Sequence, residues 1–196
     1  MYVYPLQRDG SNYNSWKRTV RLRVTTHGNS QYLECDVEVP ENQSCQMIDF
    51  LFSVVDSTII NNIDLNEKRE PVSILWERLK EFGAKRYNKN LELLENSINT
   101  LMITDPQKSV ELVDNLIAKF DAIEKLGRII DDREKIRSLA RAISNCSRLR
   151  EIHNMCTVAG SDAKFEAFAN LIADAFTKLL RNTKYLLSRK RLKLSE

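Results

Sequence analysis

Apolar residues recur at intervals of three and four over most of the chain, which is the spacing of one face of an α-helix. The segment over residues 44–63 is apolar nearly all round, so we expect it to form a central buried helix. The helices expected from this point onward span residues 44–63, 71–83, 91–101, 105–127, 131–143, 147–156 and 161–180. The pattern therefore predicts a mainly helical chain.

Residues with known preferences for helix ends mark several of these limits. Pro71 suits a first helical turn, because the amide hydrogen that proline lacks would have no partner there. Gly83 is expected to help end the same helix. Asp131 and Glu134 have the spacing of a capping box at the start of a helix.

Near the N-terminus the pattern has two interpretations. Trp16 and Val20 are four residues apart, as on one face of a helix that Gly28 would end. Polar and apolar residues also alternate on both sides of residues 27–30, which is typical of a β-hairpin near residues 19–39. The pattern alone leaves both interpretations open.

Composition supports a helical fold of modest size. The chain has 196 residues, long enough for one domain or two small ones. Five glycines and four prolines are few, and strand-rich folds need more turn residues. The best candidate for a joint between domains is Asp105-Pro106, because an aspartate can cap the following helix and a proline can occupy its first position.

Charge is distributed unevenly along the chain. Residues 1–23 carry a net charge of +4 and residues 178–196 a net charge of +6, which leaves −7 for residues 24–177. A basic segment attracts polyanions such as RNA, because each neutralised phosphate releases counterions. The candidate nucleic-acid-binding residues are Lys184, Arg189, Lys190, Arg191 and Lys193. The alternatives are a solvated helix end, whose cations offset the helix dipole, and a nuclear-import signal over residues 189–191.

Residue patterns typical of enzymes and metal sites are missing from the sequence. It contains two histidines, no HExxH run, no nucleophile elbow and no glycine-rich phosphate loop. Cys146, His153 and Cys156 lack both the usual zinc spacing and a fourth ligand. The segment over residues 133–150 is basic but has no helix-turn-helix signature. We expect no catalytic residue, no cofactor, no metal and no small-molecule substrate.

The sequence also bears on where the protein is found. The N-terminus lacks the basic-then-apolar layout of a signal peptide. The most apolar window, residues 47–63, contains charged residues and is shorter than the ~20 apolar residues of a membrane span. We expect a cytoplasmic protein without a membrane partner, whose four cysteines are reduced thiols.

Four segments resemble the Gag capsid region of copia-type LTR retrotransposons. Residues 6–17 contain G-S-N-Y-N-S-W, similar to the family's L-x-G-x-N-Y-x-x-W run, and residues 75–79 match its LW-x-x-L segment. Residues 94–101 and 109–135 are similar to the two segments that follow in the family. The order and spacing of the four segments carry the resemblance. Its motif residues are Gly10, Tyr13, Trp16, Leu75, Trp76, Leu79, Phe120 and Gly127.

The resemblance implies an all-α capsid protein that self-assembles into virus-like particles around RNA and has no enzymatic activity. It favours the helix over the hairpin at Trp16. The implied domains are an N-terminal lobe over residues 1–104, a C-terminal lobe over residues 105–180 and a basic tail over residues 181–196. The expected partners are copies of the chain itself and RNA.

Two departures from the family pattern qualify this expectation. An L-P pair often follows the family helix that residues 136–143 match, and this chain has Ser144-Asn145 nearby instead. No zinc knuckle follows the capsid-like region, so RNA contacts would come from basic segments. The alternative is a domesticated or truncated Gag, acting as an interaction module or as a restriction factor that disrupts a related capsid lattice.

Overall fold

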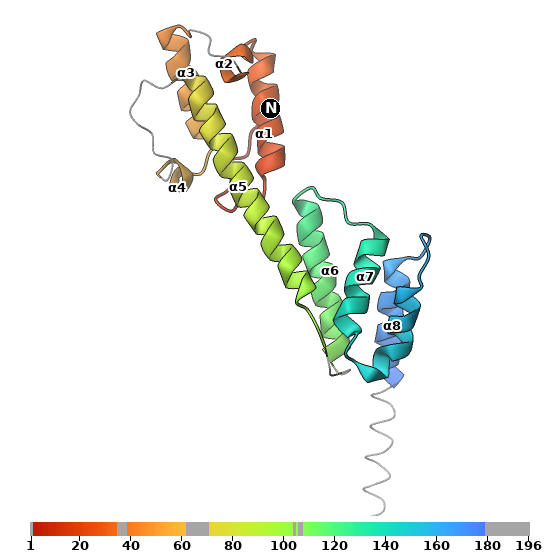
Figure 1. The fold of residues 1–196 in the computed structure, drawn as a ribbon. Helices are drawn as coiled ribbons and strands as arrows, with labels where there is room; N and C mark the ends of the chain where they lie inside the picture. Colours follow the sequence, from red (N-terminus) through yellow and green to blue (C-terminus); the bar gives the residue numbers. More distant parts are fainter. Residues whose placement is uncertain (1, 35–38, 62–70, 104, 106–107, 179–196) are drawn as a thin grey trace, which may run out of the picture. The chain divides into compact units, whose positions relative to one another are not determined.

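The computed structural model describes residues 2–34, 39–61, 71–103, 105 and 108–178 (Figure 1). Within these ranges the regular structure is helical, as the sequence predicts, and the only extended pairing is an isolated bridge between Leu6 and Val55. The elements are α1 (Tyr13–Thr26), α2 (Gln31–Glu34), α3 (Glu41–Ser53), α4 (Ser57–Ile60), α5 (Val72–Asn99), α6 (Ser109–Lys125), α7 (Asp132–Ile143), the 3-10 helix η2 (Ser147–Leu149), α8 (Arg150–Thr157) and a helix over residues 165–178.

The chain divides into two compact units. The first unit is Met1–Leu93 and the second is Leu94–Glu196, so the division falls inside α5. The joint expected at Asp105-Pro106 lies beyond α5, and Pro106 is outside the described residues. The lobe and tail limits drawn from the family stay predictions.

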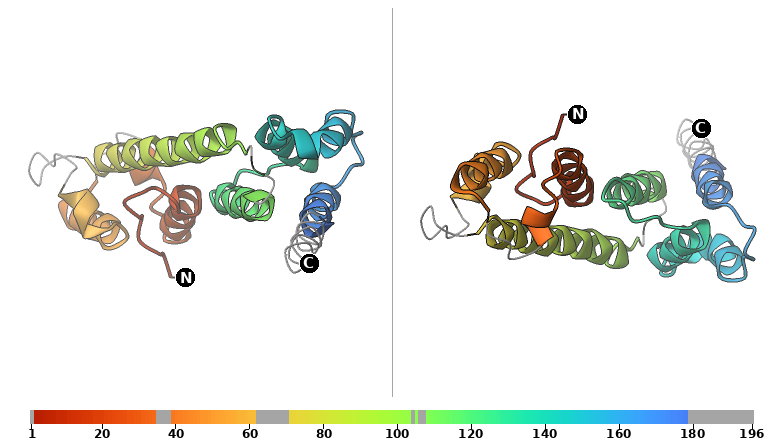
Figure 2. Two further views of the ribbon diagram at one scale, coloured as in Figure 1. Left: turned by 90° about the horizontal axis from the view of Figure 1, so that it is seen from below. Right: turned by 90° about the horizontal axis from the view of Figure 1, so that it is seen from above.

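The first unit packs α1 and α3 on the same side of α5 (Figure 2). Trp16, Val20 and Val24 are spaced by four residues along α1 and are buried together. The Trp16 ring lies 5.3 Å from the ring of Trp76 on α5, measured between centroids. Aromatic contacts of this kind give a small helical unit a large share of its buried apolar area.

The hairpin alternative near residues 19–39 is wrong for the part of it that the structure describes. A strand would place Val20, Leu22 and Val24 on one face, whereas the helix buries the two valines and leaves Leu22 46% exposed. Gly28, with φ of +73°, follows the end of α1 and donates its amide to Thr25. Residues 35–38 lie outside the described ranges.

The single buried helix expected over residues 44–63 is also wrong. The helix stops at Ser53, because the Val54 carbonyl accepts hydrogen bonds from the Leu6 amide at 2.9 Å and from Trp16 Nε1 at 2.6 Å. Asp56 then caps the short α4, its carboxylate accepting from the Thr58 amide at 2.8 Å. Residues 62 and 63 are outside the described ranges.

The helices expected over residues 71–83 and 91–101 form one helix, α5, which passes through Gly83 without a break. Pro71 stands just before its first residue, where its carbonyl accepts from the Ile74 amide. Gly83 has a packing role instead of a terminating one, because the ring of Tyr13 lies directly against it.

The second unit has two layers: α7 and α8 form one, and α6 with the helix over residues 165–178 forms the other (Figure 2). Asp131 caps α7 as predicted, accepting from the Glu134 amide at 2.7 Å. Phe120 and Phe165 join the helices of the second layer through an edge-to-face contact at 5.6 Å. The last helix begins at residue 165, after a turn, and not at residue 161 as expected.

Candidate interaction surfaces

Six of the eight family-motif residues come together in the first unit. Tyr13 and Trp16 of α1 stack at 6.3 Å between centroids, and they share a core with the motif residues of α5, which are Leu75, Trp76 and Leu79. Gly10 has φ of +73°, and a Cβ atom there would lie 2.6 Å from the Tyr87 amide nitrogen. These residues therefore build the core and not an exposed site.

The remaining motif residues belong to the second unit. Phe120 is 2% exposed on α6. Gly127, two residues after α6, has φ of +91°, a backbone conformation that glycine adopts without strain. The predicted RNA-binding residues Lys184, Arg189, Lys190, Arg191 and Lys193 lie outside the described residues.

Groups with shifted pKa values are dispersed over the described part of the chain. Burial raises the pKa of the Cys156 thiol to about 11. Burial and, to a smaller extent, Glu77 raise the pKa of Tyr13. Hydrogen bonds from Thr58 lower the pKa of Asp56. The three groups belong to different elements, so these shifts do not define a common catalytic centre.

Cys146, His153 and Cys156, the cysteines and histidine considered as metal ligands, are packed against other parts of the protein. Cys146 and Cys156 are buried, and His153 is half-buried on α8. Within the described ranges, no group of three or more histidine, cysteine or acidic side chains is arranged to hold a metal ion.

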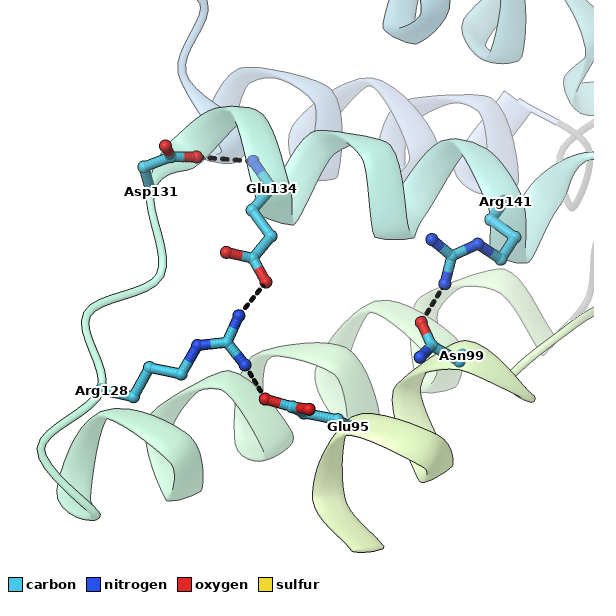
Figure 3. Close-up of polar contacts among 6 residues, drawn as sticks. All are labelled: Glu95, Asn99, Arg128, Asp131, Glu134 and Arg141. Atoms are coloured by element: carbon cyan, nitrogen blue, oxygen red, sulfur yellow. Dashed lines mark hydrogen bonds and ion pairs between the residues drawn. The ribbon is translucent and has the colours of Figure 1, made fainter. Parts of the chain in front are cut away.

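Arg128, in the loop after α6, joins the C-terminal part of α5 to the start of α7 (Figure 3). Arg128 forms ion pairs with Glu95 and, at 2.7 Å, with Glu134. At the other end of α7, Arg141 donates a hydrogen bond to Asn99 (Figure 3). Each of these contacts lies within the second unit, so the last turn of α5 is fixed to the bundle that it enters.

An apolar groove with an acidic rim lies between α6 and the helix over residues 165–178. Its volume is about 460 Å³, and its apolar lining residues are Val110, Val113, Ile117, Phe120, Phe165, Ala169 and Ala173. Asp114, Asp121 and Glu166 are exposed along the rim. Lys135 is the single basic residue of the lining, and Glu124 already pairs with it at 2.7 Å.

Ile117 lines this acid-rimmed groove and does not belong to the buried core. It follows the helical spacing of the other apolar residues of α6, yet 39% of it is exposed. The inner face of α6 uses Leu112 and Leu116 instead, both at most 3% exposed. The sequence pattern did not distinguish a core position from a groove position, because both are apolar at helical spacing.

A second hollow, of about 350 Å³, lies between α7, α8 and the turn after α8. Arg133, Arg137 and Arg141 are spaced by four residues along α7 and line it together. The other lining residues are Ile136, Ala140, His153, Cys156, Thr157, Ala159 and Gly160, with no carboxylate among them. The spacing of these arginines is visible in the sequence, but the hollow depends on where α8 packs.

Two further results bear on the class of protein. Among the described helices, none has the length and apolar character needed to cross a bilayer. Comparison of the chain with protein-family models, with curated proteins and with solved structures finds no match.

Proposed function

We propose that this chain is a non-enzymatic structural protein that associates with copies of itself into Gag-like particles and encloses RNA. The acid-rimmed groove of the second unit is the observation that supports self-association most. Its lining is apolar, its rim carries Asp114, Asp121 and Glu166, and the segment over residues 178–196 has the opposite charge.

The complementary segment combines leucines with basic residues. Residues 178–196 contain seven lysines and arginines against Glu196, together with six leucines. An apolar groove with a charged rim suits such a segment, because the leucines lose contact with water while the cations face the carboxylates. We therefore assign the groove of one copy to the basic segment of another copy.

A contact between two different surfaces is heterologous, and it leaves one copy of a joined pair with a free groove and the other copy with a free segment. Such contacts propagate into closed rings or extended assemblies, and many weak contacts of this kind make a stable particle. Because the contact is partly electrostatic and exposed, salt is expected to weaken it.

Static light scattering of the full chain at physiological salt tests this function, with Asp114→Lys/Asp121→Lys as the groove variant. Glu81→Lys/Glu92→Lys is the matched control, since it reverses two exposed carboxylates on α5, a helix that contributes no lining residue to the groove. The proposal expects particles from the wild type and the control, and a large loss of scattering for the groove variant. Equal assembly of all three proteins would show that the groove is not the contact.

A further inference from the structure

The row formed by Arg133, Arg137 and Arg141, here called the arginine row, is a basic feature in an acidic part of the chain. Residues 24–177 have a net charge of −7, yet residues 133–160 contain six lysines and arginines against Glu134 and Glu151, a net charge of +4. The basic charge is therefore concentrated on α7 and α8 and not spread evenly over the second unit.

The carboxylates close in sequence to the row have other partners, and Asp131 accepts a hydrogen bond from the Glu134 amide. Asp132 pairs with Lys164 at 3.3 Å, and Glu134 pairs with Arg128 at 2.7 Å. Arg133 and Arg137 are both exposed, and within the described residues neither guanidinium pairs with a carboxylate. An unneutralised pair of arginines in a hollow without acids is suited to hold an anion.

The geometry of the row favours an extended anion over a compact one. Four residues of α-helix rise by about 6 Å, so the Cα atoms of the three arginines span about 12 Å along α7. The ring of His153 and the hydroxyl-bearing Thr157 form part of the same hollow. A chain of phosphates that follows α7 would meet successive guanidinium groups, whereas a single phosphate would meet one or two.

We propose that the arginine row binds the phosphate backbone of single-stranded RNA. This inference rests on the proposed function for its biological use, and it gives RNA a contact in the folded second unit that does not compete with the groove for the basic segment. The contact is with phosphates and not with bases, so binding is expected to depend little on RNA sequence.

The test is fluorescence anisotropy of the full chain with a labelled 20-nucleotide U-only RNA over a range of salt concentrations. Arg133→Gln/Arg137→Gln removes two phosphate contacts and leaves Arg141, which also holds Asn99, in place. The slope of log affinity against log salt should become shallower by about 1.4, because each contact with single-stranded RNA contributes about 0.7. With the affinity at 1 M salt unchanged, binding at 0.1 M salt should be about 25-fold weaker.

Lys85→Gln/Lys89→Gln is the matched control, since it removes two exposed cations at the same four-residue spacing on α5. Its slope should equal that of the wild type. An equal loss in this control would assign the effect to net charge, and an unchanged slope in the arginine variant would assign RNA binding to another segment. Either result would overturn the proposal. Circular dichroism checks that each variant is folded, and Arg137→Gln alone, with an expected change of about 0.7, replaces the double variant if that variant unfolds.

Competition with inorganic phosphate separates the extended ligand from a compact one. At equal phosphate concentration it should displace the RNA weakly, and strong displacement would contradict an extended ligand.

The binding assay is carried out at protein concentrations too low for light scattering to detect particles. A chain that binds RNA through the arginine row but forms no particles would refute the proposed function and leave this inference standing. Particles whose RNA binding is unchanged by the arginine substitutions would refute this inference and leave the proposed function standing.

Discussion

The ring of Tyr13 lies so close to Gly83 that a Cβ atom on the glycine would come within 2.4 Å of Tyr13 Cδ2. Gly83 is inside α5, where alanine would favour the helix by about 1 kcal/mol. The close contact between α1 and α5 therefore depends on a residue that weakens the helix locally. The glycine lowers the local helix propensity, but it leaves the space that the Tyr13 ring needs to pack against α5.

Gly83→Ala is expected to destabilise the first unit by about 1–3 kcal/mol, because the added methyl group must displace an aromatic ring in a packed core. Urea unfolding measures the change. Gly160→Ala is the control, since no atom lies within 4 Å of the position that its Cβ would take. In a double-mutant cycle, Tyr13→Leu should relieve most of the cost of Gly83→Ala; strictly additive losses would show that the two residues are not coupled.

Trp16 joins the core to the chain reversal at the end of α3. Its Nε1 donates to the Val54 carbonyl oxygen at 2.6 Å in a buried hydrogen bond. Trp16→Phe keeps a ring but removes the donor, so we expect a loss of about 1–2 kcal/mol in unfolding free energy. Trp76→Phe is the matched control, because it removes a similar volume and, among the described residues, breaks no buried hydrogen bond of this kind, so it should cost less. Chemical unfolding monitored by circular dichroism measures both variants. Equal losses of unfolding free energy would mean that the hydrogen bond contributes nothing to stability.

Much of the helical architecture could be predicted because it depends on local signals. The capping of α7 by Asp131 and the spacing of Trp16, Val20 and Val24 are both readable over a few residues. The break after Ser53 was missed, because it depends on hydrogen bonds from Leu6 and Trp16, which are distant in sequence. Local periodicity cannot report a partner that the folded chain brings from elsewhere.

The candidate surfaces were less predictable than the fold. The four-residue spacing of Arg133 and Arg137 is visible in the sequence. That the neighbouring carboxylates pair with Lys164 and Arg128 instead of with this row is visible only in the structure. The groove position of Ile117 depends in the same way on how the helix over residues 165–178 packs on α6. Surfaces formed by two elements require the tertiary structure.

Arg128 is expected to contribute modestly to the stability of the second unit. It lies between Glu95 and Glu134, and its side chain is 35% exposed (Figure 3). Arg128→Gln leaves these carboxylates without their shared cation, so we expect a loss of about 1 kcal/mol at low salt. The loss should shrink in 0.5 M salt, because ions screen the repulsion between the two carboxylates. Chemical unfolding at both salt concentrations measures the change. If the loss of unfolding free energy did not depend on salt, Arg128 would stabilise the unit through packing and not through its charge.

Alkaline pH is expected to destabilise the chain through Cys156. Burial raises the pKa of its thiol to about 11 from an ordinary value near 9, so folding favours the neutral thiol. Its contribution is fully present below pH 9 and is lost as pH rises toward 11, with a maximum of about 3 kcal/mol. Tyr13, whose pKa is also raised, acts in the same direction. Cys156→Ala should therefore reduce, but not abolish, the fall in unfolding free energy between pH 9 and pH 11.

Thiol alkylation gives a separate check on this assignment. At pH 8, iodoacetamide should modify the exposed Cys45 much faster than the buried Cys146 and Cys156. Peptide mass spectrometry reads out each site. If Cys156 were modified as fast as Cys45, the burial that underlies the alkaline prediction would be refuted.

The proposed function depends on association of the wild-type chain with copies of itself. Multi-angle light scattering over a wide concentration range at physiological salt, with negative-stain microscopy and the 260/280 nm absorbance ratio of each fraction, tests it most directly. We expect a molar mass that rises with concentration, particles on the grid, and nucleic acid absorbance in the particle fraction. A constant monomer mass at every concentration, with an empty grid, would contradict it.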